Sequence, residues 1–273
     1  TKLGMDDATL AEMDGLIRKP HGIVLVTGPT GSGKTTTLYA ALSRLDATAP
    51  NIMTVEDPIE YDLDGISQTQ VNARIEMSFA RALRSILRQD PDVVMIGEIR
   101  DKETADIAIQ ASLTGHMVLS TLHTNDAVSA FTRLMDMGVE PFLVATPVRG
   151  VMAQRLVRRL CPACSVPTEP LEEVAERGGA LAPMGESQTE ANWRKAVGCP
   201  ACHGTGYKGR LGIYELVPMT KEMRHLVTTN GTPGDMQALA RQQTRVLRED
   251  GLLKAWRGLT SVEEVLRVTA EFH

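Results

Sequence analysis

Over residues 22–138, short apolar runs alternate with longer segments whose apolar residues recur at helical spacing. The apolar runs predict buried strands, and an alternating run predicts an edge strand at residues 65–71. The buried strands are expected at 22–28, 51–57, 92–98 and 116–123, and the helices at 35–45, 78–89, 102–113 and 126–138. Strands that alternate with helices form a mostly parallel sheet covered on both faces, so the pattern predicts an α/β fold.

The character of the chain changes after these elements. Residues 142–160 are expected to be helical, whereas residues 161–206 are rich in Cys, Pro, Gly and charged residues. Within this segment, residues 176–188 are expected to form a mobile loop. Short helices are expected again from residue 220 onward. We therefore divide the chain into three segments, which are 1–160, 161–206 and 207–273.

Composition narrows the classes of function. Hydrophobic residues make up 42% of the 273 residues, which is enough for a core, and the formal net charge is −5. Aromatic residues make up only 4% of this acidic chain, so nucleic acid is not an expected partner. The basic cluster RLVRR at 155–159 is expected to be spread around a helix axis. Because no apolar run approaches the roughly 20 residues that span a bilayer, a cytoplasmic location is expected.

The segment GPTGSGKTT at 28–36 follows the first predicted strand and precedes a predicted helix. It fits the pattern G-x-x-x-x-G-K-[ST], in which glycines let backbone N–H groups curl around a phosphate at a helix N-terminus. In this pattern Lys34 reaches the β- and γ-phosphates and the Thr35 hydroxyl binds Mg²⁺. The predicted phosphate site comprises Gly28, Pro29, Thr30, Gly31, Ser32, Gly33, Lys34, Thr35 and Thr36.

Three polar residues follow other predicted strands at the same end of the sheet. Glu98 ends DVVMIGE, where a carboxylate can hold metal-bound water. Gly97 precedes it where an Asp is usual, which argues against an ordinary kinase or GTPase. Glu56, in VEDPIEY, is placed to orient an attacking water, and His123 is placed to sense a γ-phosphate. A plain structural reading stays open for each, because acidic turns and histidines are common after strands.

All four cysteines stand in two CPAC units, at 161–164 and 199–202. A redox pair, disulfides or four ligands of one metal ion are the candidate explanations. A reducing compartment disfavours disulfides, and a redox CxxC usually occurs once, at a helix N-terminus. The duplicated pattern favours a tetrahedral zinc site, although its spacer exceeds the roughly 15–20 residues that are usual. Its four ligands are expected to be Cys161, Cys164, Cys199 and Cys202.

The motifs GPTGSGKTTTLY, VEDPIEY, LRQDPDVVMIGEIRD and TGHMVLSTLHTN occur in this order. They resemble the Walker A, Asp box, Walker B and His box of the secretion ATPases, the hexameric motors of type II secretion and type IV pilus assembly. The segment RLVRRLCPAC…CPACHGTGYKGRLGIYELVPM is similar to the type II secretion ATPases. The resemblance covers the chain from about residue 20 to its end. It implies a RecA-like P-loop core with a Cys₄ zinc-binding subdomain and a small helical C-terminal part.

The resemblance also assigns roles to single residues. Glu56 is expected to polarise the attacking water, Glu98 to hold the magnesium shell and His123 to lie near the γ-phosphate. Four arginines match residues that approach nucleotide phosphates in the family, some of them across a subunit boundary. These arginines are Arg84, Arg88, Arg100 and Arg210. The implied ligands are ATP, Mg²⁺ and Zn²⁺.

The family context implies a motor that powers protein secretion through pseudopilus assembly. Its members act as homo-hexamers on inner-membrane platform proteins, which places the protein in the cytoplasm, peripheral to the inner membrane. Full-length members carry domains ahead of the P-loop, so the chain is expected to be an isolated ATPase core. Pilus retraction motors usually lack the cysteine segment, which leaves a pilus extension ATPase as the nearest alternative. A nucleic-acid translocase and a scaffold that binds nucleotide without turnover are more distant alternatives.

Overall fold

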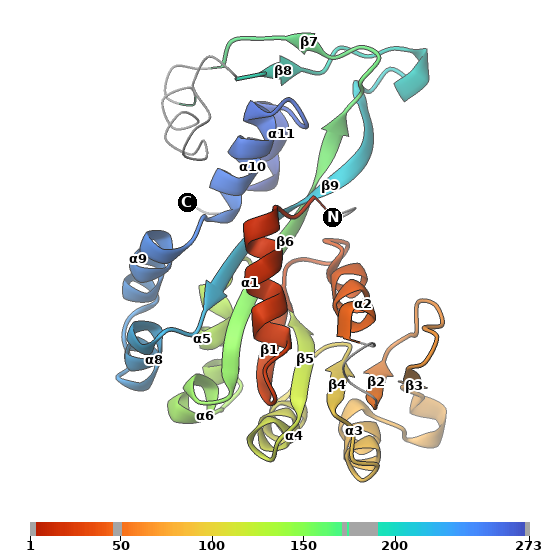
Figure 1. Cartoon of the computed structure of the whole chain (residues 1–273), viewed down its shortest axis with the longest axis vertical. Helices are drawn as coiled ribbons and strands as arrows, with labels where there is room; N and C mark the ends of the chain where they lie inside the picture. The colour runs from red at the N-terminus through yellow and green to blue at the C-terminus, as the bar shows by residue number, and fades with distance from the viewer. Residues whose placement is uncertain (1–3, 46–50, 171–173, 175–190, 271–273) are drawn as a thin grey trace. The chain divides into compact units, whose positions relative to one another are not determined.

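The computed structural model describes residues 4–45, 51–170, 174 and 191–270 (Figure 1). The chain divides into two compact units. We call them the sheet unit, which comprises Asp6–Ala153 and Leu216–Thr244, and the cysteine unit, which comprises Thr1–Met5, Gln154–Glu215 and Arg245–His273. The boundaries predicted after residues 160 and 206 both fall inside the cysteine unit, and the three-segment division stays a prediction. The loop predicted at 176–188 lies outside the described residues.

The main sheet has the strand order β3-β2-β4-β5-β1-β6-β9. Every pairing from β3 across to β6 is parallel. The predicted strands are confirmed, and β3 lies at an edge of the sheet as expected. The strand bounds are β1 Gly22–Thr27, β2 Ile52–Glu56, β3 Ser67–Gln70, β4 Val93–Ile96, β5 Met117–Leu122, β6 Val148–Leu160 and β9 Tyr207–Pro218.

The helices of the sheet unit form where apolar residues recur at helical spacing, and polar side chains cap several of them. The Asp101 carboxylate, for example, accepts a 2.7 Å hydrogen bond from the Thr104 N–H at the start of α4. Both α2 and α4 pack on β1 and β5, whose residues are all buried. The helix bounds are α1 Asp7–Ile17, α2 Lys34–Leu45, η1 Ala73–Ile75, α3 Phe79–Leu87, α4 Lys102–Leu113, α5 Val128–Asp136, α6 Pro141–Ala145, α8 Lys221–Thr228 and α9 Pro233–Gln243.

The helix predicted at 142–160 is wrong for most of its length. Only α6 at its start is helical, and β6 follows as a 13-residue strand. β6 contains both residues that favour helices and β-branched valines, which favour strands. Its pairing with β1 selects the strand over the helix. β6 and α1 also approach each other closely at Gly150. A Cβ at this position would lie 2.7 Å from the Leu16 side chain, so the contact requires glycine.

The cysteine unit has a small apolar core that includes residues of α10 (Leu247–Trp256) and α11 (Val262–Val268). This core consists of Val174, Leu252, Ala255 and Val265, with Trp193 and Val262 packed against it. The short helices expected from residue 220 onward are confirmed. No helix in the described part of the chain is long and apolar enough to cross a membrane. The remaining elements are β7 Val166–Pro167, β8 Arg194–Lys195, η3 Pro200–Cys202, α10 Leu247–Trp256 and α11 Val262–Val268.

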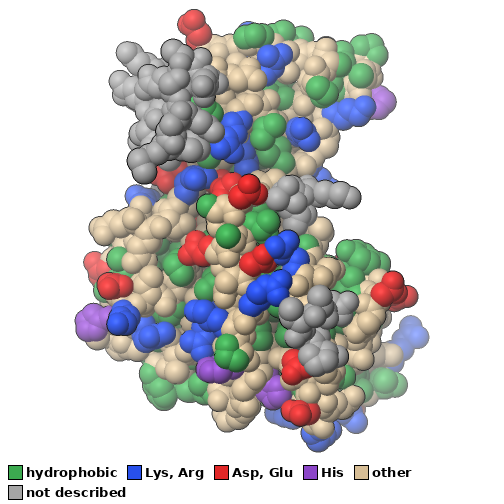
Figure 2. Space-filling model, viewed as in Figure 1, with side chains coloured by type: hydrophobic (Ala, Val, Ile, Leu, Met, Phe, Trp, Pro, Cys, Tyr) green, Lys and Arg blue, Asp and Glu red, His purple; other side chains and the backbone are tan. Residues whose placement is uncertain are grey.

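The basic cluster at 155–159 lies in a strand, so the expected spread around a helix axis is wrong. Arg155 is buried and donates to the Val268 carbonyl at 2.9 Å. Arg158 donates to the Glu264 carboxylate at 2.8 and 3.1 Å, and its guanidinium lies 4.1 Å from the centre of the Tyr207 ring. These side chains therefore stabilise the cysteine unit. On the face drawn in Figure 2, Lys and Arg are interspersed with Asp and Glu.

Glu264 is a buried carboxylate between two arginines. Arg158 also donates its backbone N–H to this carboxylate at 2.9 Å, and Arg267 donates to it at 2.8 and 3.0 Å. Burial acts to raise the pKa of Glu264, but the hydrogen bonds from Arg267 and Arg158 outweigh burial and lower it to about 2. Because the folded pKa lies below the unfolded value, the ionised carboxylate stabilises the cysteine unit at neutral pH.

We expect the Glu264 contribution to be complete above about pH 4.5 and to disappear as pH falls from there toward about 2. The shift corresponds to about 3 kcal/mol of unfolding free energy. Glu264→Gln should lower the stability at pH 7 and flatten its decline between pH 5 and pH 3, measured by urea unfolding at several pH values. Glu263→Gln is the matched control, because Glu263 is exposed on the same helix. An unchanged acid decline in Glu264→Gln contradicts this assignment.

Candidate functional site

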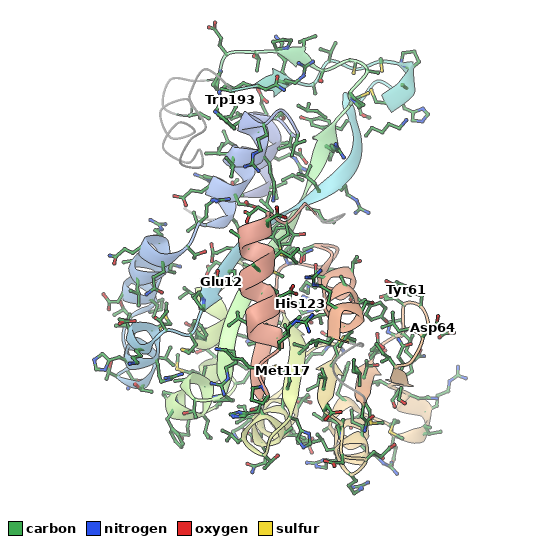
Figure 3. All side chains as sticks on the ribbon, in the orientation of Figure 1. Glu12, Tyr61, Asp64, Met117, His123 and Trp193 are labelled. Carbon is green, nitrogen blue, oxygen red and sulfur yellow. The ribbon has the colours of Figure 1, made fainter. Side chains whose placement is uncertain are left out.

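The predicted site residues meet because parallel strands end at one edge of the sheet. Thr27 pairs with Leu122, and Ile96 pairs with Ser120, so β1, β4 and β5 end together. The loop after β1 contains the glycine motif, Glu98 lies two residues beyond β4, and His123 follows β5 directly (Figure 3). Glu56 is the last residue of β2, which pairs with β4. Ligands of open parallel sheets bind at this carboxyl edge.

The loop between β1 and α2 has the backbone that only glycine adopts freely. Gly28, Gly31 and Gly33 have φ values of 151°, 79° and 84°, which lie in the region disfavoured for other residues. The Ser32 N–H donates to the Pro29 carbonyl at 3.2 Å, which closes a turn inside the loop. α2 begins at Lys34, so the N–H groups of its first turn and of this loop are available to an anion.

Lys34 lies inside this loop and is only 8% exposed. Its Nζ donates to the Gly28 carbonyl at 2.7 Å and to the Pro29 carbonyl at 2.9 Å. Burial lowers the pKa of Lys34, and the Glu98 carboxylate acts in the opposite direction. Lys34 and Glu98 therefore interact electrostatically across the carboxyl edge of the sheet.

A threonine pair joins the ends of β1 and β5 beneath the loop. The Thr27 and Thr124 hydroxyls lie 2.6 Å apart. The Thr124 N–H donates to the Thr27 hydroxyl at 2.8 Å, and that hydroxyl lies 3.1 Å from the Leu122 carbonyl. The Thr27 hydroxyl thus contacts the backbone on both sides of His123. These contacts fix the position of His123 relative to the loop.

Glu98, Arg100 and His123 form an ionic cluster. The Glu98 carboxylate pairs with the Arg100 guanidinium, and it lies 3.2 Å from His123 Nε2. Burial acts to raise the pKa of Glu98, but Arg100 and His123 outweigh burial and lower it. Glu98 is therefore held in its negatively charged form. A carboxylate needs this charge if it is to hold the hydration shell of a cation.

Glu56 is 2% exposed and lies among three donors. Its Oε1 accepts a hydrogen bond from the Tyr39 hydroxyl. Its Oε2 accepts from Thr54 Oγ1 at 2.7 Å and from Gln68 Nε2 at 3.0 Å. The structure thus places Glu56 at the expected strand end, with the carboxylate oriented by its neighbours.

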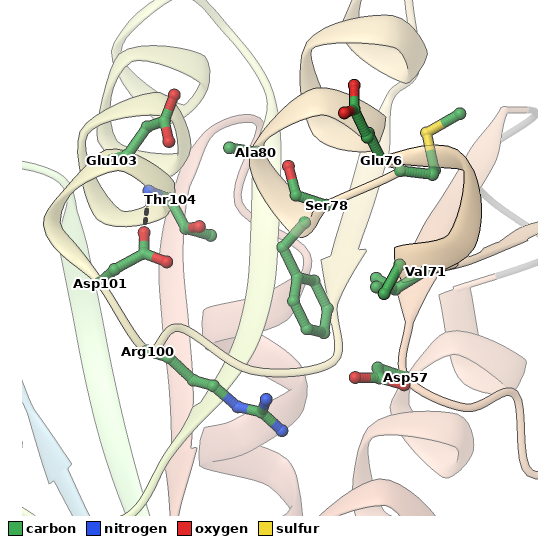
Figure 4. A pocket seen from close by; sticks show the side chains of 12 residues that line it. Asp57, Val71, Glu76, Ser78, Ala80, Arg100, Asp101, Glu103 and Thr104 are labelled. Atoms are coloured by element: carbon green, nitrogen blue, oxygen red, sulfur yellow. Dashed lines mark hydrogen bonds between the residues drawn. The ribbon is translucent and has the colours of Figure 1, made fainter.

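The four predicted arginines lie in different surroundings. Arg84 pairs with Glu103 at 2.8 Å on the surface, and Arg88 is exposed at the end of α3. Arg100 lines a pocket between η1, α3 and the start of α4, and Figure 4 shows its guanidinium directed toward Asp57. Arg210 is exposed on β9 and belongs to the cysteine unit. Of these four arginines, only Arg100 contacts another predicted site residue, which is Glu98.

The four cysteine thiols gather at one point of the cysteine unit. All four Sγ atoms lie within 4.8 Å of one another, and the shortest separations are 3.7, 3.8 and 3.9 Å. All four are free thiols, so the structure does not join them as disulfides. Thiolates placed about 2.3 Å from one tetrahedral zinc ion lie about 3.8 Å apart, so the donor set fits a zinc ion.

Backbone N–H groups surround the same thiols. Cys202 Sγ accepts from the N–H groups of Cys199 and Gly206, both at 3.2 Å, and Cys164 Sγ accepts from the Gly198 N–H at 3.4 Å. Burial acts to raise the pKa of Cys202, but the two backbone donors help to lower it to about 6. Burial raises the pKa of Cys164 to about 11. Such N–H···S bonds orient metal-binding thiolates.

Comparison with known proteins decides the family. The family model described as "Type II/IV secretion system protein" matches residues 1–267. The chain belongs to this family. The type II secretion system protein HxcR of Pseudomonas aeruginosa is 62% identical over 98% of the chain, and the type II secretion system ATPase E of Vibrio cholerae is 56% identical over 94%. The chain spans about half the length of these relatives, with 53% and 50% covered.

Solved structures of related proteins confirm the predicted fold class. The structure of the pilus retraction motor PilT with bound ADP matches 98% of the chain and 65% of its own, with a TM-score of 0.72 and 28% identity. The Legionella pneumophila ATPase DotB has a TM-score of 0.70 at 23% identity, over 99% of the chain and 64% of its own. The chain therefore has the α/β fold, with a parallel sheet, that these two structures have.

Sequence motifs of the family did not indicate every residue that shapes the site. Tyr39 ends the quoted motif GPTGSGKTTTLY, but the motif assigns no role to it. Gln68 lies on the edge strand, where a polar residue is unremarkable. Both contact Glu56 only because α2 and β3 pack beside β2, which neither residue's local sequence reveals.

Arg100→Gln should raise the pKa of Glu98, because it removes the guanidinium that favours the ionised carboxylate. The measurement is an NMR titration of the side-chain carboxyl carbon of Glu98. Arg84→Gln is the matched control, since Arg84 pairs with Glu103 and should leave the titration of Glu98 unchanged. A Glu98 pKa that is equal in the parent and in Arg100→Gln contradicts the ion-pair assignment.

Proposed function

We propose that the chain is the ATP-hydrolysing part of a motor that powers protein secretion in a type II system. The observation that carries this proposal is the glycine loop between β1 and α2. It holds Lys34 inside the loop, within electrostatic reach of Glu98, at the carboxyl edge of a parallel sheet. Membership of the secretion system family and the name of the Vibrio cholerae relative support the same activity.

In this proposal, different residues of the chain have different roles in phosphoryl transfer. Loop N–H groups and Lys34 bind and neutralise the β- and γ-phosphates, and the Thr35 hydroxyl binds Mg²⁺. Glu98 would hold the magnesium hydration shell, and His123, whose Nε2 lies 3.2 Å from the Glu98 carboxylate, would sense the γ-phosphate. Glu56 polarises the attacking water by accepting its proton. ATP supplies the scissile phosphoanhydride, and Mg²⁺ neutralises the charge that develops on its phosphates.

The proposal extends to the assembly. We assign Arg100, Arg84, Arg88 and Arg210 to nucleotide phosphates in a homo-hexamer, where arginines are supplied within and between subunits. The exposure of Arg84, Arg88 and Arg210 supports a role outside their own subunit's core. ATP binding and hydrolysis would move domains of the motor, and this movement would be transmitted to inner-membrane platform proteins from the cytoplasmic side. No nucleic acid is proposed as a partner, because Arg155 and Arg158 of the basic cluster at 155–159 bind acceptors within the cysteine unit.

A type IV pilus extension ATPase is the second candidate. Likeness to the pilus retraction motor PilT over 98% of the chain supports a pilus role in general, and the cysteine segment favours extension over retraction within that role. The relatives with the higher identities are type II secretion proteins, which favours secretion over pilus assembly. Complementation of a secretion-deficient strain and of a pilus-deficient strain by the full-length protein separates the two functions.

We further propose that the cysteine cluster holds one structural zinc ion. The sulfur separations of 3.7–3.9 Å support it, because a structural site closes all four tetrahedral positions with protein ligands. The ion would join η3 to the turn after β6. Its stabilising effect would fall on the cysteine unit, since all four ligands belong to that unit.

Lys34→Ala should reduce ATP hydrolysis by on the order of 10²–10³-fold, because no other charge inside the loop offsets the transferred phosphate. The measurement is phosphate release per chain under saturating ATP and Mg²⁺. Lys221→Ala is the matched control, since Lys221 is exposed at the start of α8 and should retain the parent rate. Equal rates for Lys34→Ala and the parent would contradict the proposed site.

The purified chain should contain about one zinc ion, measured by elemental analysis of metal-replete protein. Cys164→Ser should lose most of the metal and lower the melting temperature of the cysteine unit, whereas nucleotide binding by the sheet unit should persist. His203→Asn is the control, because His203 neighbours Cys202 but is exposed and is not part of the thiol cluster. Four freely reactive thiols in folded, metal-replete protein would exclude the zinc site.

A further inference from the structure

The three donors around Glu56 fix both oxygens of its carboxylate. Thr54 lies two residues before Glu56 on β2, so both side chains project from the same face of the strand. Thr54 and Gln68 donate to Oε2, and Tyr39 donates to Oε1. A carboxylate offers about four acceptor positions. The contacts therefore fill Oε2 and leave one position on Oε1, next to the Tyr39 hydroxyl.

The direction of the Tyr39 hydrogen bond follows from its second partner. The Glu60 N–H donates to the Tyr39 oxygen at 3.2 Å, so the tyrosine's own proton is directed to Glu56. Burial and the hydrogen bond to Glu56 raise the pKa of Tyr39 to about 12. The hydroxyl is thus protonated, and acts as a donor, throughout the physiological range.

Tyr39 also connects two parts of the proposed site. It lies on α2, whose first residue is Lys34, and it is 1% exposed. The exposed Tyr61 packs edge-on against the Tyr39 ring, with ring centres 4.8 Å apart, and this contact restricts movement of the Tyr39 ring. The hydroxyl therefore holds the carboxylate at the end of β2 at a fixed position relative to the helix of the phosphate loop.

We propose that Tyr39 is a positioning residue that aims the open acceptor position of Glu56 Oε1 at the attacking water, with Gln68 fixing the other oxygen. This inference rests on the proposed ATPase function. Without the Tyr39 hydroxyl, Thr54 and Gln68 still hold Oε2, but Oε1 loses its hydrogen bond and the direction of its open acceptor position is less tightly fixed. Water activation slows as a result, whereas nucleotide binding is retained because Lys34 and the loop are unchanged.

The test compares Tyr39→Phe with Tyr61→Phe in the same chain. Tyr39→Phe keeps the buried ring and removes one hydroxyl. Single-turnover ATP hydrolysis should slow roughly 10- to 100-fold, as expected for loss of one hydrogen bond to a charged group. Affinity and stoichiometry for a fluorescent ATP analogue should stay within about twofold of the parent. Tyr61→Phe removes an exposed hydroxyl and should match the parent in both assays.

Gln68→Met provides a second variant that removes a donor from Oε2, and it should also slow hydrolysis at unchanged nucleotide affinity. A Glu56→Gln background separates positioning from general structural damage. There, adding Tyr39→Phe should cause no further loss, because the tyrosine acts through Glu56. The same fold-loss in the Glu56→Gln background as in the parent would overturn the proposal, as would a parent rate in Tyr39→Phe whatever the rate of Gln68→Met. A parent chain that binds ATP without hydrolysing it overturns the proposed function, and this inference with it.

Discussion

Parallel pairing of buried strands is the constraint on which the rest of the structure depends. Every residue of β1, β2, β4 and β5 is buried, so polar side chains that contact a ligand can stand only at the strand ends. Because the strands run in one direction, those ends meet at one edge. Lys34, Glu56, Glu98 and His123 lie far apart along the chain, and the register of these strands brings them together.

The buried carboxylates of Glu56, Glu264 and Asp250 each accept hydrogen bonds from several donors. Glu56 lies among three donors, and Glu264 lies between two arginines. In the cysteine unit, the buried Asp250 accepts from Lys254 at 2.6 Å and from the Tyr214 N–H at 2.9 Å. Removing one partner of a buried ion pair such as Asp250–Lys254 costs about 3–5 kcal/mol. Each network therefore fixes the relative position of elements that are distant in sequence, which a purely apolar contact does less specifically.

The sequence predicted the buried strands and placed Glu56, Glu98 and His123 at the ends of three of them. Short apolar runs indicated these strands, and the glycine motif indicated the loop that holds Lys34. β6 was missed because Met, Ala, Gln, Arg and Leu favour helices locally, and pairing with β1 overrides that preference. Tyr39 and Gln68 were missed because their roles arise from packing of α2 and β3 beside β2. The cysteine pattern predicted a cluster that the structure contains, although 161–164 and 199–202 are separated by a long segment.

We propose that the loop after β1 presents its N–H groups to the phosphates of ATP. Hydrogen–deuterium exchange of the amides of residues 28–36, measured with and without ATP and Mg²⁺, reports on these N–H groups. Nucleotide should slow exchange in this loop and at the start of α2, while the helices of the cysteine unit should exchange at unchanged rates. Exchange in residues 28–36 that stays the same at saturating nucleotide would show that the loop does not bind the phosphates.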